Sequence, residues 1–425
     1  MSERTTYRYY VLALLTLTML LGIADRLVLS VLIEDIKPEF QLSDSQIGLL
    51  AGVSFTLFYV VVGFPLGWLA DRSRRTRIIA IALAFWSLMT ALCGAATGFA
   101  SLFAARAGVG AGEGGSGPSA QSLLADYFRP NELARALGFY MLGATLGTVG
   151  GLVAGGLLAD RFGWRMTFVL LGLPGIMLAA IFYLTVREPP RGRYAVASVS
   201  PPASLESIGA TLRALAVNRA YVGATLGYAV QIMIGYAMAI WMAPLMMRKF
   251  NVSAGEVGVY LGLAFALGGI PGPIAGGYLT DWLVRYDPRW RAWLPGLVGL
   301  ICIPFLWAAL AAGTFTVFLV LFAIGYGVFV SSQAPILSLI HISVAANQRA
   351  MAFATASFFN NLVGQALGAT LIGRLSDVWR SAPGGQGLGW AVLTISSTAA
   401  LLAMAIFAWT SLHVERRQAG RNTPA

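Results

Sequence analysis

The pattern Gly-x-x-x-Asp occurs four times along this chain, each time at the end of a long apolar segment. The copies are Gly67–Asp71, Gly156–Asp160, Gly277–Asp281 and Gly373–Asp377. They close the second, fifth, eighth and eleventh apolar segments, so one copy falls in every third segment. This period is typical of membrane transporters that are built from internal repeats. The sequence therefore predicts twelve membrane-spanning helices, arranged as four three-helix units in two halves.

The composition agrees with a chain that crosses a membrane many times. Hydrophobic residues make up 57% of the chain and charged residues 11%, with a mean hydropathy of +0.73. Soluble domains carry about 25% charged residues. A helix that crosses a bilayer needs about 20 mostly apolar residues. We therefore expect spans near residues 10–33, 46–70, 78–98, 101–125, 135–159, 164–186, 219–247, 255–280, 292–312, 314–340, 349–375 and 388–412.

The net charge of +11 comes from 29 Lys and Arg against 18 Asp and Glu. Most of these basic residues fall at the two termini, in the central loop and in the loops on one side of the predicted membrane. By the positive-inside rule, this bias predicts a multi-pass membrane protein with both termini in the cytoplasm. We expect the membrane to be the cell (inner) membrane. The basic excess thus reflects topology, and we expect no nucleic acid as a partner.

A polar central stretch separates the two halves. We expect residues 1–187 to form an N-terminal six-helix bundle, residues 188–217 a cytoplasmic linker, and residues 218–425 a C-terminal six-helix bundle with a short tail. The first part of the linker is rich in Pro, Ser and Ala, a composition that forms no core of its own. Residues 205–217 show helical spacing of apolar positions, which predicts a short amphipathic helix.

Four ionisable residues lie inside predicted spans: Asp25, Arg26, Arg106 and Glu113. A charge at the bilayer centre costs about 2.5–3.5 kcal/mol on insertion scales, and such residues usually face a cavity. The alternative is a set of structural pairs that neutralise one another. We interpret these residues as functional, with Arg26, Arg106 and Glu113 in substrate binding.

Helix geometry gives a depth to each of these charges. Asp25 is expected about 12 Å below the outer end of the first span, and Arg106 about 8 Å deep from the same side. Glu113 follows on the same helix face, about 10.5 Å deeper than Arg106. If the two helices are neighbours, Asp25 and Arg106 can pair. An anion between Arg26 and Arg106 would then displace a carboxylate, which takes up a proton, so Asp25 and Glu113 are the expected proton-coupling residues.

The second half contains neutral polar and aromatic residues where the first half contains charges. Such side chains suit an apolar ligand with a few oriented hydrogen bonds, although they also serve as packing contacts between helices. The predicted substrate-binding residues of this half are Tyr228, Gln231, Tyr236, Gln333 and Asn360.

Two glycine patterns indicate close helix packing. The run Gly110–Gly115 formally matches the dinucleotide fingerprint G-x-G-x-x-G, but it lies inside a span without the required preceding strand. We expect these glycines to thin the fourth span beside Glu113. In the fifth span, Gly143, Gly147 and Gly151 recur at intervals of four, which predicts a flat stripe for another helix.

The segment Gly67–Arg77 resembles the loop between the second and third helices of the major facilitator superfamily. That resemblance implies a gating latch at one membrane face, formed by Gly67, Asp71, Arg72 and Arg75. The alternative is a simple basic anchor that follows the positive-inside rule.

The runs Ile23–Leu27, Ile36–Phe40 and Ser43–Leu50 are similar to the spinster-like family of this superfamily, as are Ala105–Glu113 and Ala125–Phe128. The resemblance implies an all-α integral membrane protein with the major facilitator superfamily fold. Its twelve transmembrane helices would form two six-helix halves, each made of two inverted three-helix repeats.

Eukaryotic members of the spinster-like family move sphingosine-1-phosphate and lysophospholipids, so the resemblance implies a proton-coupled transporter of amphipathic anionic lipids. We expect a monomer that works by alternating access, with the substrate and membrane lipids as partners and no metal or cofactor besides a proton gradient. The alternative cargo is a small organic acid or a drug. A passive channel or scramblase would ignore a pH gradient, and an enzyme would need a reactive constellation that the sequence lacks.

Overall fold

The structure is a computed structural model that describes residues 2–194, 205–345, 348–380 and 387–419. The regular secondary structure of these residues is helical throughout. The Pro/Ser/Ala-rich part of the predicted linker, residues 195–204, lies outside the described residues. The chain forms two compact units: unit 1 comprises Met1–Val199 and Met246–Gly262, and unit 2 comprises Ser200–Leu245 and Leu263–Ala425.

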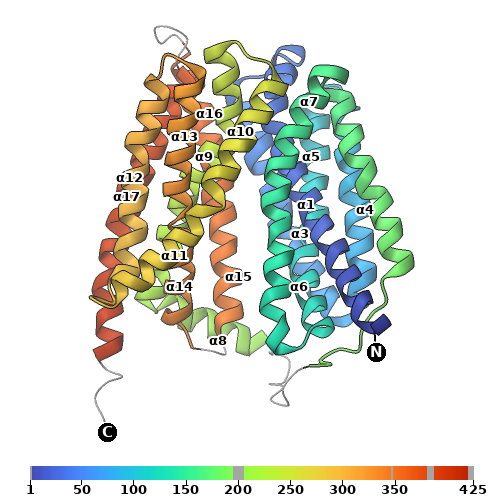
Figure 1. The fold of residues 1–425 in the computed structure, drawn as a ribbon, viewed down its shortest axis with the longest axis vertical. Helices are drawn as coiled ribbons and strands as arrows, with labels where there is room; N and C mark the ends of the chain where they lie inside the picture. The colour runs from blue at the N-terminus through green and yellow to red at the C-terminus, as the bar shows by residue number, and fades with distance from the viewer. Residues whose placement is uncertain (1, 195–204, 346–347, 381–386, 420–425) are drawn as a thin grey trace. The chain divides into compact units, whose positions relative to one another are not determined.

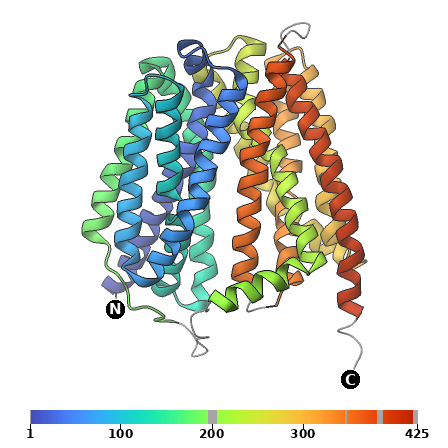
Figure 2. The same ribbon diagram turned by 180° about the vertical axis from the view of Figure 1, so that it is seen from behind.

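In unit 1 the long helices run side by side along one direction (Figures 1 and 2). The helices are α1 (Ser2–Glu39), α2 (Asp44–Gly48), the π-helix η1 (Leu49–Val53), α3 (Ser54–Arg72), α4 (Arg75–Cys93), α5 (Phe99–Glu113), α6 (Ser116–Tyr127) and α7 (Pro130–Thr185). Unit 1 also includes the end of α9 (Arg219–Phe250) and the first part of α10 (Ala254–Gly269).

Unit 2 contains the remaining parts of α9 and α10 and the helices of the second half. These are α8 (Leu205–Ala216), α11 (Pro271–Val284), α12 (Trp290–Ala311), α13 (Phe315–Val330), α14 (Gln333–Ser343), α15 (Arg349–Phe359), the π-helix η3 (Asn360–Leu367), α16 (Gly368–Val378) and α17 (Gly387–Ala419).

The described helices account for the twelve predicted spans. Nine of them are long and apolar enough to cross a membrane. One of the nine, α7, contains both the fifth and the sixth span, because its backbone turns at Gly163 (φ 75°, ψ 165°). A positive φ of this kind favours glycine. The fourth and eleventh spans complete the set, and each is built of shorter helical segments.

Five predicted spans depart from a continuous α-helix. The second takes π-helical hydrogen bonding over Leu49–Val53, and the eighth divides at Ile270 into α10 and α11. The fourth divides at Gly114–Gly115 into α5 and α6, and the tenth divides at Ser331–Ser332 into α13 and α14. The eleventh remains helical but takes π-helical hydrogen bonding over Asn360–Leu367. Glycine and serine loosen a helix, and π-helical turns often occur at functional sites. The sequence analysis treated each of these spans as one continuous helix.

The predicted glycine stripe brings α7 against α1. A Cβ atom added at Gly143 or Gly147 would collide with main-chain oxygens of Thr16 or Leu20, and one at Gly151 would meet Ala24. The fourth-span glycines act in the same way, because a Cβ at Gly110 or Gly114 would collide with the backbone of α3. Backbones approach this closely only where side chains are absent.

Ion pairs distinguish the two ends of unit 1. At the end that carries the N-terminus, here called the N-terminal face, Arg8 forms an ion pair of 2.7 Å with Glu132. Tyr7 donates a hydrogen bond of 2.7 Å to the main-chain oxygen of Thr185. Both ends of α7 therefore meet the start of α1. At the opposite face, Arg165 follows the Gly163 turn and pairs with Glu39 at 2.5 Å.

Candidate functional site

Arg26 and Glu113 form an ion pair in the interior of unit 1. Nε and Nη2 of Arg26 both contact Oε2 of Glu113, at 2.8 and 2.6 Å. The pair joins α1 to the last residue of α5, directly before the Gly114–Gly115 break. Gly22 lies one turn before Arg26, next to this carboxylate, since a Cβ there would stand in van der Waals contact with Oε2 at 3.4 Å. The sequence analysis singled out both charges but did not pair them.

Two aromatic rings of α3 hold the guanidinium of Arg26. Its Cζ lies 4.6 Å from the ring centroid of Phe55 and 4.9 Å from that of Tyr59. The two rings stack on each other at 5.6 Å. Phe55 also lies 5.9 Å from Cζ of Arg106, so it contacts both arginines of the cluster. Cation–π contacts of this kind strengthen when water is excluded.

Asp25 and Arg106 meet, but not through the carboxylate. Nη1 of Arg106 donates a hydrogen bond of 2.8 Å to the main-chain oxygen of Asp25. The carboxylate accepts instead from Oγ1 of Thr90 on α4, at 3.0 Å from Oδ2. Asp25 and Arg106 therefore lie at the same depth, as expected. The expected ion pair between them is absent: Arg106 binds the backbone carbonyl of Asp25, and the carboxylate of Asp25 binds the hydroxyl of Thr90.

The cluster keeps unused hydrogen-bonding capacity. Among the described residues, Oδ1 of Asp25, Oε1 of Glu113 and Nε of Arg106 are buried without a hydrogen-bond partner. Asp25, Arg106 and Glu113 are themselves only 2%, 1% and 4% exposed. A buried polar atom without a partner carries a desolvation cost. The cluster is therefore able to accept a proton or a polar ligand atom with a gain in free energy.

The residues singled out in the second half lie in unit 2. Gln231 is buried and donates a hydrogen bond of 3.2 Å to the main-chain oxygen of Pro295, which ties α9 to α12. Asn360 begins the π-helix η3, which packs on α9, since Gly364 lies against Ile232. The next residue after η3, Gly368 of α16, lies against Met233 of α9. Tyr228, Tyr236 and Gln333 are half-buried, on α9 and at the start of α14.

The predicted gating residues occupy the turn from α3 to α4. Arg75 is buried and pairs with Asp126 at 2.6 Å and with Glu188 at 2.8 Å, so it links α4 to α6 and to the segment after α7. Arg72 is exposed, and a Cβ added at Gly67 would meet nothing within 4 Å. The side chain of Asp71 lies outside the described residues, so the latch stays a prediction.

The second copy of the Gly-x-x-x-Asp pattern makes contacts that the sequence analysis did not anticipate. Asp160 accepts hydrogen bonds from Oγ of Ser253 at 2.7 Å and from the backbone N–H of Gly255 at 3.0 Å. It thereby caps the first turn of α10, where free N–H groups and the helix dipole favour an anion. Gly156 permits this approach, because a Cβ there would collide with Ala254.

A second unanticipated contact lies at the opposite face of unit 1. Arg248 binds Asp44 through two hydrogen bonds of 2.8 Å and Glu34 through one of 2.9 Å. We call Glu34, Asp44 and Arg248 the opposite-face clasp. The sequence contains a signal for this clasp, since Arg248 is a basic residue on the side of the predicted membrane that carries few basic residues.

Known proteins resemble this chain over nearly its whole length. A model of the Major Facilitator Superfamily matches residues 14–369. An MFS-type efflux pump of Mycolicibacterium smegmatis is 32% identical over 397 residues, which cover 93% of this chain and 91% of the pump. Human protein spinster homolog 1 is 29% identical over 385 residues, or 86% of this chain and 72% of that protein.

One solved structure extends the similarity to the fold. It is a bacterial homologue of the human lysosomal transporter spinster, in an inward-facing and unoccupied conformation. The superposition has a TM-score of 0.83 at 29% identity and covers 99% of both chains.

Proposed function

We propose that this chain, which belongs to the major facilitator superfamily and within it to the spinster-like proteins, is a secondary transporter of amphipathic anions. Its proposed cargo class is lysophospholipids or sphingosine-1-phosphate-like lipids. Transport is coupled to protons and proceeds by alternating access. The spinster-like resemblance implies the cargo class. The charged cluster of unit 1 supports it with the chemistry that recognises an anionic head group.

The observation that carries the proposal is the accessibility of Arg26. Its side chain is 20% exposed, whereas that of Glu113 is 4% exposed, and Asp25 and Arg106 are buried. A ligand anion therefore reaches Arg26 first. Phe55 and Tyr59 lie against the face of the guanidinium. A phosphate or carboxylate therefore binds at its edge, where it competes with Glu113.

Competition for Arg26 couples the anion to a proton. A head group on Arg26 replaces Glu113 as the anionic partner. An ionised carboxylate is costly to bury without its cation, so Glu113 takes up a proton when the anion binds. Departure of the anion and of the proton restores the ion pair. Asp25, with one unpartnered oxygen among the described residues, serves as a second proton site.

Unit 2 supplies the contacts to the apolar tail in this proposal, and the first Gly-x-x-x-Asp copy supplies the latch. The proposed tail contacts are Tyr228, Gln231, Tyr236, Gln333 and Asn360, and the proposed latch is Gly67, Asp71, Arg72 and Arg75. The N-terminal face is cytoplasmic in the inner membrane, because basic residues concentrate at the termini and in the loops of that side. The proposal includes a functional monomer.

Binding of lysophospholipids with graded chain length tests the cargo. We expect affinity to grow with the tail, by about 0.8 kcal/mol for each methylene that becomes buried. Arg26→Ala should weaken binding by roughly 10- to 100-fold, the value of a charge-assisted hydrogen bond. The exposed Arg129 offers a control substitution outside the site. Binding that ignores both tail length and Arg26 would refute the lipid assignment.

Transport in liposomes tests the coupling. With an imposed pH gradient, the wild-type protein should accumulate substrate, and Glu113→Gln should transport only down the substrate gradient. A Glu113→Gln protein that still responds fully to the pH gradient would remove this residue from the coupling.

A second candidate cargo is a small organic acid or a drug. One observation favours this cargo: the relative of 32% identity is an MFS-type efflux pump. The site is compatible with it, because the edge of a guanidinium binds carboxylates as well as phosphates. Short organic acids belong in the same binding series. Tight binding of a short acid together with weak binding of every lysolipid would favour this candidate over the lipid.

A further inference from the structure

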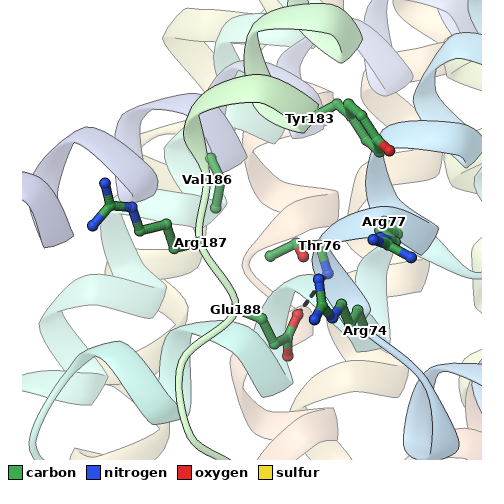
Figure 3. Close-up of a pocket in the computed structure, with 7 residues that line it drawn as sticks. All are labelled: Arg74, Thr76, Arg77, Tyr183, Val186, Arg187 and Glu188. Carbon is green, nitrogen blue, oxygen red and sulfur yellow. Dashed lines mark hydrogen bonds between the residues drawn. The ribbon is translucent and has the colours of Figure 1, made fainter.

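A pocket at the N-terminal face of unit 1 lies apart from the charged cluster. Its volume is about 570 Å³, and it is lined by Arg74, Thr76, Arg77, Tyr183, Val186, Arg187 and Glu188 (Figure 3). These residues come from the start of α4, the end of α7 and the segment directly after α7. We propose that this pocket binds the head group of an anionic diacyl phospholipid of the surrounding membrane. The site is independent of the cargo proposed above.

The charge of the pocket favours an anion. Arg74 and Arg77 are exposed at the first turn of α4 and stand on the same side in Figure 3, while the guanidinium of Arg187 turns away from them. Glu188 is already engaged by Nε of Arg75 at 2.8 Å and by the backbone N–H of Thr76 at 2.9 Å. Its carboxylate is therefore directed to α4 and leaves the two arginines for a ligand.

The helices that form the pocket also provide surfaces for acyl chains. On α7, exposed apolar residues precede the pocket at helical spacing: Leu173, Met177, Ile181 and Leu184. On α4, they follow it in the same way: Ile81, Phe85, Leu88 and Leu92. The two helices are in direct contact, since Gly172 lies against Ser87 and Ala91. An anionic head group in the pocket can therefore extend its tails along lipid-facing helix surfaces.

The pocket lies at the end of a membrane-spanning helix, at the expected level of the lipid head groups. Tyr183 is 54% exposed at the end of a membrane-spanning helix, where tyrosines typically meet the head-group region. Basic pockets between helix ends at the membrane surface are suited to phospholipid head groups. A single-tailed cargo that enters unit 1 would instead reach Arg26. The pocket is thus assigned to a membrane lipid rather than to the transported molecule.

Native mass spectrometry of the purified full-length protein tests the proposal, with phosphatidylglycerol as the anionic probe and phosphatidylcholine, which is zwitterionic and carries no net charge, as its counterpart. We expect wild type to retain phosphatidylglycerol selectively. Arg74→Gln/Arg77→Gln should weaken this binding roughly 30-fold, or about 2 kcal/mol, since one basic residue near an anionic membrane surface contributes about 1 kcal/mol. The control Arg129→Gln/Arg135→Gln removes two exposed charges of the same unit and should retain the lipid.

Two further experiments distinguish binding of an intact lipid from binding of a free anion. Glycerol phosphate without acyl chains should compete only weakly, and equal competition would mean that the pocket binds free anions and not a lipid. Phosphatidylglycerol should also raise the thermal unfolding temperature of wild type more than that of the pocket variant, which reports on binding independently of mass spectrometry. Retention of the lipid by the pocket variant, or equal loss in the control, would overturn the proposal. Arg26→Ala should leave phosphatidylglycerol binding unchanged.

Discussion

Arg26 and Arg106 both lie among the helices of unit 1, where Arg26 is partly exposed and Arg106 is buried, and they bind different partners. Arg106 donates to a main-chain oxygen of α1, a contact that fixes α5 against α1 and involves no titrating group. Arg26 binds a carboxylate, so its partner can be exchanged or neutralised. This difference favours Arg26 over Arg106 as the residue whose partner a ligand can replace, while substrate binding by either arginine stays a prediction.

Removing one member of the Arg26–Glu113 pair tests this assignment. Arg26→Gln should lower the free energy of unfolding by up to about 3–5 kcal/mol, because it leaves a buried carboxylate without its cation. The double variant Arg26→Gln/Glu113→Gln should recover part of that loss. Thermal unfolding in detergent measures both effects. The deficit of the single variant should shrink as the pH falls, since a proton neutralises Glu113, and a pH-independent deficit would contradict the model.

Glycine positions set the distances between helices. Gly143, Gly147 and Gly151 on α7 let the backbone of α1 approach, and α1 carries Asp25 and Arg26. Gly110 and Gly114 do the same for α5 and α3. The charged cluster depends on these contacts, because it joins side chains from α1, α3, α4 and α5.

Two neighbouring glycines of α7 provide a matched test. A methyl group at Gly147 would collide with the main-chain oxygen of Leu20, whereas one at Gly150 would meet nothing within 4 Å. We expect Gly147→Ala to destabilise the protein by about 1–3 kcal/mol through overpacking, and Gly150→Ala to be neutral or slightly stabilising. Thermal unfolding of the two variants side by side gives the answer. Equal stability would mean that α1 and α7 are less closely packed than the structure shows.

Several of the basic residues on the side of the predicted membrane that carries few of them have acidic partners. Lys37 pairs with Asp44 at 2.6 Å, Arg165 with Glu39 at 2.5 Å, and Arg248 with Glu34 and Asp44 at 2.8 Å. These ion pairs neutralise basic residues on the side of the predicted membrane where the positive-inside rule expects few of them.

For the chain as a whole, the two compact units do not follow chain order. Met246–Gly262 belongs to unit 1, although it lies between segments of unit 2. The opposite-face clasp and the Asp160 cap both hold this segment within unit 1. A transporter that alternates between states needs contacts of this kind that can open and close.

Substitution of Arg248 should loosen this segment. We expect Arg248→Gln to increase hydrogen–deuterium exchange across Met246–Gly262, because the segment loses its ion pairs with α1 and α2. Lys249→Gln removes a neighbouring charge that is not part of the clasp and serves as the control. If both variants exchange like wild type, the clasp does not hold the segment, and the Asp160 cap would be the next contact to remove.

The sequence was sufficient to predict the class of fold, the number of spans, the glycine stripe and the four charges inside the membrane. Each of these follows from the properties of one segment at a time. The transfer of a helix into the bilayer depends on its own apolar length, and the face and depth of a residue follow from the helical repeat. The domain boundaries, the substrate and the latch at Asp71 stay predictions.

The binding partners of the four charged residues could be identified only from the arrangement of the helices in space. Glu113 binds Arg26, and the carboxylate of Asp25 binds Thr90 and not Arg106. Phe55 and Thr90 carry no charge, so nothing in their segments distinguished them from ordinary helix residues. A hydrogen bond or an ion pair forms only within a few ångströms. Those distances are set by how closely backbones from distant parts of the chain pack, which no single segment contains.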